Sequence, residues 1–176
     1  GYGEHEVAVI EIDAERIVSR VSIPESFYGL AFTPDGSELF CSGAGDEVLH
    51  RFSFADGYLG NRRELRVRVE TERGVPSGLA VTPDGASLWL ANLWGNRVTR
   101  VELAADPRVT DYDPFPASPV LLPPANAAVA QPSAFPYTCL IDSRRGRVLT
   151  SLWAEAKVAV QSAQGGEILA SWTTEE

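Results

Sequence analysis

One octapeptide, Gly-Leu-Ala-x-Thr-Pro-Asp-Gly, occurs twice in this chain and constrains its fold more than any other feature. The first copy begins at Gly29 and the second at Gly78, an offset of 49 residues. The similarity extends beyond the motif in the same register, because residues 39–43 follow the first copy as residues 88–92 follow the second. Self-similarity over a unit of this length indicates a repeat architecture. The chain is therefore expected to consist of repeated structural units.

Each unit is predicted to contain four short strands. In the first unit, an apolar run over residues 29–32 ends at a Pro-Asp-Gly sequence, residues 34–36. This tripeptide favours a turn, because proline fixes φ, aspartate bonds the nearby backbone and glycine accepts a positive φ. Two later stretches, 48–54 and 64–70, alternate apolar and polar residues with the period of two that strands show. Four strands in a unit of about 40 to 50 residues are typical of one propeller blade.

The rest of the chain extends this pattern in both directions. A more divergent unit follows over residues 135–172, and its Leu152-Trp153 pair matches Leu93-Trp94 of the second unit. Before the first unit, residues 6–13 and 16–23 resemble the two outer strands of a blade. The predicted fold is all-β, a β-propeller segment of about 3.5 four-stranded blades. We expect a partial blade over residues 1–25, a blade over 26–74, a blade over 75–134 with a Pro-rich insertion over 106–134, and a blade over 135–176.

The repeat count implies an incomplete ring. Closed propellers have roughly four to eight blades, so about 3.5 units fall short. The sequence also begins within a blade and contains no methionine. We therefore expect a fragment of a larger ring. Its uncovered blade flanks would expose apolar surface and favour self-association.

The repeated motif also carries a family resemblance. Followed by Leu-Trp-Leu-Ala-Asn over residues 88–92, it resembles the consensus of the YVTN-repeat β-propellers. Residues 27–29 and 48–57 are similar to the N-terminal propeller of YncE-like proteins that carry a separate phosphoesterase domain. The resemblance covers about residues 6–172 and implies a lactonase-like propeller scaffold and a periplasmic or secreted location. It carries over no catalytic residue, because the phosphoesterase domain lies outside this chain and the scaffold supports many unrelated functions.

The charge balance excludes one class of partner. The net charge is −9 at pH 7 and the pI is near 4.7, whereas nucleic-acid binding requires a basic footprint. No stretch reaches the roughly 18 apolar residues of a membrane-spanning helix, so no membrane span is predicted. Arginines and glutamates alternate between residues 62 and 73, and we interpret them as a solvated outer strand rather than a binding patch. These arginines are Arg62, Arg63, Arg66, Arg68 and Arg73.

The composition shifts between residues 106 and 136, a stretch that holds eight of the 12 prolines. This segment must supply the outer strand of the second full blade, which we place at residues 120–122. The remainder is expected to form a long loop into the next blade. Such loops are commonly functional, and the alternative is a tolerated surface insertion.

The cysteines and histidines offer little chemistry. Cys41 and Cys139 are the only cysteines, and the repeat register places both at apolar strand positions. Buried thiols fit these positions better than a disulfide between different blades. His5 and His50 are the only histidines, and no His-x-His or Cys-x-x-Cys spacing occurs. Neither a metal nor a cofactor is predicted.

The sequence contains no recognisable motif for nucleophilic hydrolysis. There is no Gly-x-Ser-x-Gly motif and no Gly-rich phosphate loop that opens a helix. Asp35 and Asp84 are the aspartates of the two Pro-Asp-Gly turns, and turn formation accounts for both. No catalytic residue is therefore predicted. The sequence favours a chain that is not an enzyme by itself but leaves the question open.

Propeller geometry indicates one candidate site. The loops that lead into the innermost strands open on the same face as the loops between the second and third strands. Aromatic side chains with a few polar groups are typical of a small-ligand or partner site, although repeated aromatics also fill gaps between blades. Asp46 and Glu155 are the acidic groups of this face. The expected ligand-binding residues at the channel mouth are Tyr28, Ser77, Asn92, Trp94, Tyr137 and Trp153.

The sequence leaves two functions open. The leading hypothesis is a non-catalytic propeller module that binds a protein partner or a small ligand. It would belong to a larger secreted or periplasmic protein, such as one with an attached phosphoesterase domain. The alternative is part of a propeller enzyme of lactonase-like hydrolase or quinoprotein-like type. That alternative needs acidic, Asn or His groups that converge in the channel.

Overall fold

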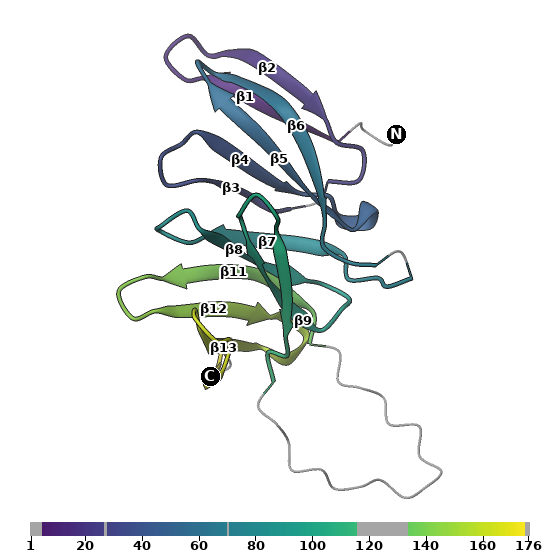
Figure 1. The fold of residues 1–176 in the computed structure, drawn as a ribbon, viewed down its shortest axis with the longest axis vertical. Coiled ribbons are helices and arrows are strands. Elements are labelled where there is room, and N and C mark those ends of the chain that lie inside the picture. Colours follow the sequence, from purple (N-terminus) through teal and green to yellow (C-terminus); the bar gives the residue numbers. More distant parts are fainter. Residues whose placement is uncertain (1–4, 27, 70, 116–133, 175–176) are drawn as a thin grey trace, which may run out of the picture.

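The computed structural model describes residues 5–26, 28–69, 71–115 and 134–174. Over these residues the chain forms fourteen β-strands and two single-turn 3₁₀ helices, arranged as one two-stranded and three four-stranded antiparallel sheets. Figure 1 shows the sheets following one another along the long axis, from β1 and β2 at the top to the sheet of β11 and β12 below. The prediction of an all-β propeller segment is confirmed.

Each sheet is built from strands that are consecutive in the chain. The two-stranded sheet contains β1 (Glu6–Glu11) and β2 (Arg16–Ser22). The first full blade contains β3 (Leu30–Phe32), β4 (Glu38–Ser42), β5 (Val48–Ala55) and β6 (Tyr58–Arg66). The second contains β7 (Pro76–Val81), β8 (Ser87–Asn92), β9 (Arg97–Glu102) and β10 (Arg108–Tyr112). The third contains β11 (Pro136–Asp142), β12 (Arg147–Leu152), β13 (Lys157–Ser162) and β14 (Ile168–Thr173).

The outer strand of the first full blade lies earlier than the alternation predicts. β6 begins at Tyr58 and ends at Arg66, rather than covering residues 64–70. The reason is the two-residue turn before it, in which Asp56 and Gly57 have φ values of 52° and 81°. Two positive φ values in succession are typical of a tight hairpin turn, so pairing with β5 resumes immediately after it.

The outer strand of the second full blade is β10, which pairs with β9 from Arg108↔Glu102 to Tyr112↔Val98. It therefore follows β9 after a short connection. The strand that we placed at residues 120–122 lies outside the described residues. β10 is largely exposed and has few apolar residues, so the sequence contains little sign of it as a strand.

Two glycines of the repeated motif allow the innermost strands to approach each other closely. A Cβ atom on Gly29 would lie 2.1 Å from the carbonyl oxygen of Ser77. A Cβ atom on Gly78 would lie 2.5 Å from the Cα atom of Thr138. Both distances are shorter than any real contact, so a side chain at either position would push β3 from β7 or β7 from β11. The motif glycine is therefore required by packing between blades.

Apolar clusters fill the spaces between neighbouring sheets. One cluster, which includes Phe40, Leu49 and Leu88, lies between the first and second full blades. Cys41 belongs to the cluster between β1–β2 and the first full blade, and Cys139 to the cluster between the second and third. Both thiols are buried and unpaired, which confirms the prediction from the repeat register.

Arg68 corrects the interpretation of the arginine run as a solvated outer strand. It lies beyond the end of β6, and its side chain is only 2% exposed. The guanidinium makes a two-pronged ion pair with Asp111 of the next blade, with Nη1–Oδ2 and Nη2–Oδ1 distances of 2.8 and 3.1 Å. Nη2 also donates to Thr99 Oγ1 at 3.1 Å. The alternating pattern missed this role because the partner lies 43 residues later in the chain.

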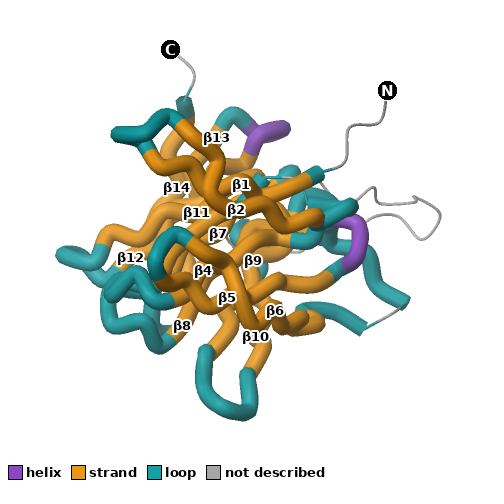
Figure 2. The backbone as a smooth tube through the Cα atoms, turned by 90° about the horizontal axis from the view of Figure 1, so that it is seen from above, coloured by secondary structure: helices purple, strands orange, loops and turns teal. Residues whose placement is uncertain are grey.

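The two 3₁₀ helices, η1 (Ala44–Asp46) and η2 (Trp153–Glu155), mark one end of the blades. Each connects the second strand of a blade to the third. Figure 2 shows both helices on the same side of the molecule. Among the described residues, no helix has the length and apolar character needed to cross a membrane.

Candidate functional site

The candidate face is formed by the loops that lead into the innermost strands and the loops between the second and third strands. Backbone hydrogen bonds join the two sets of loops. In the second blade, the Leu93 amide donates to the Val75 carbonyl at 3.1 Å. In the third, the Trp153 amide donates to the Phe135 carbonyl at the same distance. Val75 and Phe135 have φ values of 52° and 47°, which are uncommon for residues with bulky side chains. The same backbone geometry, including its strain, thus recurs at the start of both innermost strands.

The structure brings Tyr28 and Tyr137 together at this face. Their ring centroids are 4.7 Å apart, with an angle of 44° between the ring planes. Tyr28 precedes β3 and Tyr137 lies in β11, so the contact joins the first and third full blades across the second. Tyr28 remains 51% exposed.

Ser77 lies next to this tyrosine contact but is completely buried. Its hydroxyl donates to the carbonyl oxygen of Tyr137 at 2.9 Å and lies 3.1 Å from that of Ala91. Ser77 therefore joins β7 to β11 through hydrogen bonds. A ligand at the face would not reach it in this structure.

Asn92 is also completely buried, at the end of β8. Its side-chain amide donates to Thr99 Oγ1 at 2.8 Å and to the Arg97 carbonyl at 3.1 Å. Thr99 in turn contacts Arg68 and Asp111. Asn92 is thus part of the polar network between the first and second full blades, and it supports the loop that follows it.

Trp94 and Trp153 are the most exposed aromatic side chains of the predicted set, at 63% and 74%. The ring of Trp153 contacts the ring of Phe135 edge-on at 6.3 Å. The two Leu-Trp pairs are not structurally equivalent, although the sequence matched them. Leu152 occupies the strand position of Asn92, because Asn92 pairs with Pro76 as Leu152 pairs with Pro136. The sequence match was displaced because it aligned residue types rather than strand pairing.

Sequence reasoning missed a repeated contact between blades, in which a side-chain oxygen accepts hydrogen bonds from backbone amides. We call this contact the clamp. Glu47 is buried, and its carboxylate accepts hydrogen bonds from the amides of Gly74 and Val75 at 3.0 Å each. Asn96, which is 49 residues later, accepts one from the amide of Ala134 at 2.9 Å. Both residues immediately precede the third strand of a blade and have positive φ values. The 49-residue offset between two acceptor side chains was the signal that could have revealed this clamp.

The aspartates of the Pro-Asp-Gly turns have the structural role that the sequence predicts. Asp35 Oδ1 accepts hydrogen bonds from the Thr33 hydroxyl at 2.6 Å and from the Ser37 amide at 3.1 Å. These bonds lower the pKa of Asp35 to about 2. Asp84 makes the same contacts, with the Thr82 hydroxyl and a backbone amide, and its pKa is also lowered. Both carboxylates therefore serve as hydrogen-bond acceptors within their turns.

Neither thiol has the character of a nucleophile. Burial raises the pKa of Cys41 to about 11 and that of Cys139 to about 12. A thiol with a raised pKa is protonated and unreactive near neutral pH. Within the described residues, no three His, Cys, Asp or Glu side chains are grouped so that they could hold a metal ion.

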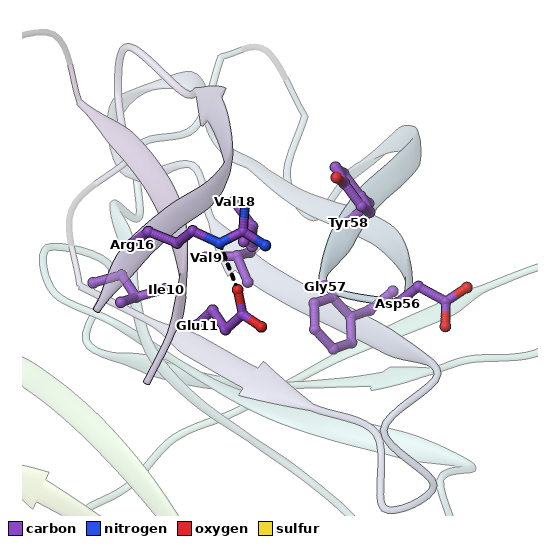
Figure 3. A pocket seen from close by; sticks show the side chains of 9 residues that line it. Val9, Ile10, Glu11, Arg16, Val18, Asp56, Gly57 and Tyr58 are labelled. Atoms are coloured by element: carbon purple, nitrogen blue, oxygen red, sulfur yellow. Dashed lines mark hydrogen bonds and ion pairs between the residues drawn. The ribbon is translucent and has the colours of Figure 1, made fainter. Parts of the chain in front are cut away.

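A separate pocket of about 370 Å³ lies far from the predicted residues, between the β1–β2 and β5–β6 hairpins (Figure 3). Its lining includes Ile10, Val18 and Tyr58, with an ion pair between Arg16 and Glu11 at 2.6 Å. It lies at the turns of these two hairpins, where β1 and β5 end. The channel-mouth loops lie at the opposite end, where the third strands begin. None of the predicted site residues lines it.

The fold and the face described above define a segment of a β-propeller. The family described as "SMP-30/Gluconolactonase/LRE-like region" matches residues 3–123, more than half of the chain. The chain belongs to this family.

Solved structures with the same fold include enzymes. Virginiamycin B lyase from Staphylococcus aureus matches with a TM-score of 0.66 and 16% identity, over 98% of this chain and 50% of its own length. The periplasmic gluconolactonase of Pseudomonas aeruginosa matches with a TM-score of 0.66 and 18% identity, over 97% and 49%. The Cps50 β-propeller domain of Myceliophteria thermophila matches with a TM-score of 0.70 and 10% identity, over 98% and 50%. The chain thus spans about half the length of these structures. No curated protein sequence matches it.

These findings correct the leading hypothesis of a non-catalytic module. The family is named for a gluconolactonase, and solved neighbours include a gluconolactonase, a lyase and a luciferin-regenerating enzyme. Enzymatic propellers therefore fit the chain better than a binding scaffold. The sequence hypothesis was wrong because the repeat motif specifies the scaffold and says little about activity.

Proposed function

We propose that this chain is part of a propeller enzyme, a lactonase-like hydrolase that opens the ring of a sugar lactone. The observation that carries the proposal is the family match over residues 3–123. The likeness to a periplasmic gluconolactonase supports the same substrate class. Water would add to the lactone carbonyl, and the ring C–O bond would break to give a hydroxy acid.

The proposed active face is the one that carries the loops between second and third strands. Trp94, Trp153 and Tyr28 offer exposed aromatic surface there, which suits the apolar face of a small cyclic ligand. Glu155 lies on the same face and is paired with Lys157 at 3.1 Å. The buried Ser77 and Asn92 would support the loops rather than contact substrate.

Hydrolysis is best tested on the polypeptide encoded by the complete reading frame that contains these residues. D-Glucono-1,5-lactone would be supplied at pH 6.5, and the acid released would be titrated continuously against the spontaneous rate. Each ring opened yields one carboxylic acid, which ionises fully at this pH. We expect a clear acceleration over the spontaneous rate. A folded protein that gives none would overturn the proposal.

Two variants locate the active face. The double substitution Trp94→Ala and Trp153→Ala should lower kcat/KM about tenfold, because two exposed aromatic contacts are lost. Tyr58→Ala is the control, since Tyr58 is about as exposed as Trp94 but lies on the pocket at the opposite end. Equal effects of the two changes would place the activity elsewhere on the ring.

Two finer assignments accompany this proposal. A periplasmic or secreted location is supported by the periplasmic gluconolactonase among the structural neighbours. The resemblance to YVTN-repeat and YncE-like propellers is supported by the two Pro-Asp-Gly motifs. Secretion would be tested by fractionating cells that express the complete reading frame and locating the protein with an antibody.

A further inference from the structure

We infer that Tyr28 and Tyr137 together form a stacking platform that selects a cyclic substrate over its acyclic counterpart. This inference rests on the proposed lactone hydrolysis and names the residues that would make it ring-selective. The two rings come from different blades and meet at the channel mouth, with centroids 4.7 Å apart. Their planes diverge by 44°, so the pair offers two aromatic faces at an angle rather than one flush stack.

The repeat shows that the tyrosines occupy equivalent positions. Tyr28 precedes the motif leucine by two residues, as Ser77 does in the second copy, and Tyr137 stands two residues before Cys139 in the third unit. The middle position therefore holds a small residue between two large ones. Because Ser77 is completely buried, it leaves the space above β7 to the two rings. Two large residues and one small one at these positions let the outer two rings meet.

Several features hold the tyrosines at this short distance. Gly29 and Gly78 remove the side chains that would separate the three innermost strands. The Ser77 hydroxyl holds the Tyr137 carbonyl at 2.9 Å. Phe135, two residues before Tyr137, adopts a positive φ of 47°. Backbone strain of this kind persists where the surrounding structure enforces it, and it is common at ligand sites.

The tyrosine pair presents surface that a ligand can contact. Trp89, which fills a gap between blades, is completely buried. Tyr28 instead leaves 51% of its surface exposed at the mouth. A tyrosine side chain combines an apolar ring with a hydroxyl group at its edge, which is a combination that aromatic residues use at binding sites.

A pyranose-like lactone complements such a surface. One side of its ring presents C–H groups that pack on an aromatic face, while its hydroxyl groups lie at the edge. The ring is also rigid, so it loses little conformational freedom on binding. An acyclic ester of the same acid lacks a flat face and loses more freedom. The platform should therefore lower KM for the lactone much more than for the acyclic ester.

The kinetic test uses Tyr28→Ser and Tyr137→Ser, which install the residue found at the middle position. The substrates are D-glucono-1,5-lactone and methyl D-gluconate, and the protein is the one encoded by the complete reading frame. KM for the lactone should rise about five- to tenfold, the range expected for loss of an aromatic contact, with kcat within about twofold. KM for the acyclic ester should change less than twofold. An unchanged KM for the lactone, or equal increases for both substrates, would overturn the platform.

Two further variants separate stacking from folding. Tyr28→Phe keeps the aromatic face and should keep the KM for the lactone, whereas a rise equal to that of Tyr28→Ser would contradict stacking. Tyr58→Ser removes an exposed tyrosine from β6 at the opposite end and should leave KM unchanged. An effect as large as that of Tyr28→Ser would also reject the platform.

Binding without hydrolysis distinguishes this inference from the proposed function. Saturation-transfer NMR would compare methyl α-D-glucopyranoside, a ring without an ester, with the acyclic polyol D-glucitol. The ring protons of the glycoside should receive saturation from the wild-type protein and lose it in the Tyr28→Ser, Tyr137→Ser double variant. This result without lactone hydrolysis would support the platform and reject the hydrolase. Lactone hydrolysis together with equal saturation transfer to the glycoside and to D-glucitol would support the hydrolase and reject the platform.

Discussion

At the residue scale, the strongest single feature is the buried ion pair between Arg68 and Asp111. Burial opposes ionisation of Asp111, but hydrogen bonds from Arg68 and Thr99 outweigh it and hold its pKa below the ordinary value of 3.8. Arg97 adds a third contact at 3.2 Å. A buried pair is weak evidence of net stabilisation, whereas removing one partner leaves an uncompensated charge and is costly.

This ion pair predicts an acid-sensitive joint between the first two full blades. Because the folded-state pKa of Asp111 is lowered, its contribution is complete above the unfolded value and is lost as the pH falls through the folded value. Asp111→Asn should cost about 2–4 kcal/mol at pH 7, since the buried Arg68 would keep only the more distant and exposed Glu72 carboxylate, at 3.6 Å. Urea unfolding at several pH values measures both effects. The difference in free energy of unfolding between wild type and variant should become smaller below about pH 4. A difference that does not change with pH would contradict this account.

At the element scale, the distance between innermost strands is set by glycine. Gly78 faces the backbone of Thr138 in β11, and Gly29 faces the carbonyl of Ser77 in β7. These glycines have no positive φ, in contrast to Gly36 and the other turn glycines. Their role is therefore to allow strands from different blades to approach, which also brings the channel-mouth tyrosines together.

The substitution Gly78→Ala tests this role. The added Cβ would lie 2.5 Å from the Thr138 Cα atom, so β7 and β11 must separate. We expect a loss of about 1–3 kcal/mol in the free energy of unfolding, as for overpacking elsewhere. Gly60→Ala is the control, because the nearest atom is the mobile Ser53 hydroxyl at 3.3 Å. Its loss should stay below that of Gly78→Ala, and equal losses in urea unfolding would argue against close approach as the cause.

At the scale of the whole molecule, apolar side chains remain exposed on the flanks of two blades. Leu30 and Phe32 on β3 are 54% and 47% exposed, and Leu140 on β11 is 63% exposed. Leu30 and Phe32 pair with Cys41 and Leu39 of β4. The side chains of Cys41 and Leu39 are covered by the sheet of β1 and β2, whereas those of Leu30 and Phe32 stay exposed. Surfaces of this kind favour association with another apolar surface.

We therefore predict that the 176-residue chain self-associates in isolation. Light scattering should give a mass above the monomer mass of 19.0 kDa that rises with concentration. Replacing Leu30 and Leu140 with lysine should shift the population toward the monomer, because charges on the flanks oppose apolar contact. A stable monomer of the unmodified chain at high concentration would refute the prediction.

The local pattern of the sequence predicted most of the strands but not the contacts between sheets. The Pro-Asp-Gly turns and the period-two alternation placed β3, β4, β5, β8 and β9 within a few residues of their observed positions. The candidate site was predicted only as a set of loops on one face. Trp94 and Trp153 are exposed there, Tyr28 meets Tyr137, and Ser77 and Asn92 are buried supports. Side-chain exposure depends on neighbouring blades, which local spacing does not describe.

By itself, the sequence determined the repeated all-β scaffold, because turn chemistry and strand periodicity act over a few residues and recur every 49. Tertiary structure decided which residues meet across the blades: Arg68 with Asp111, Glu47 with the amide of Gly74, and Tyr28 with Tyr137. These contacts join positions far apart in the chain, and they form only when separate sheets pack at a fixed distance. The motif glycines set that distance, so one sequence feature determines the scaffold locally and the channel mouth only after folding.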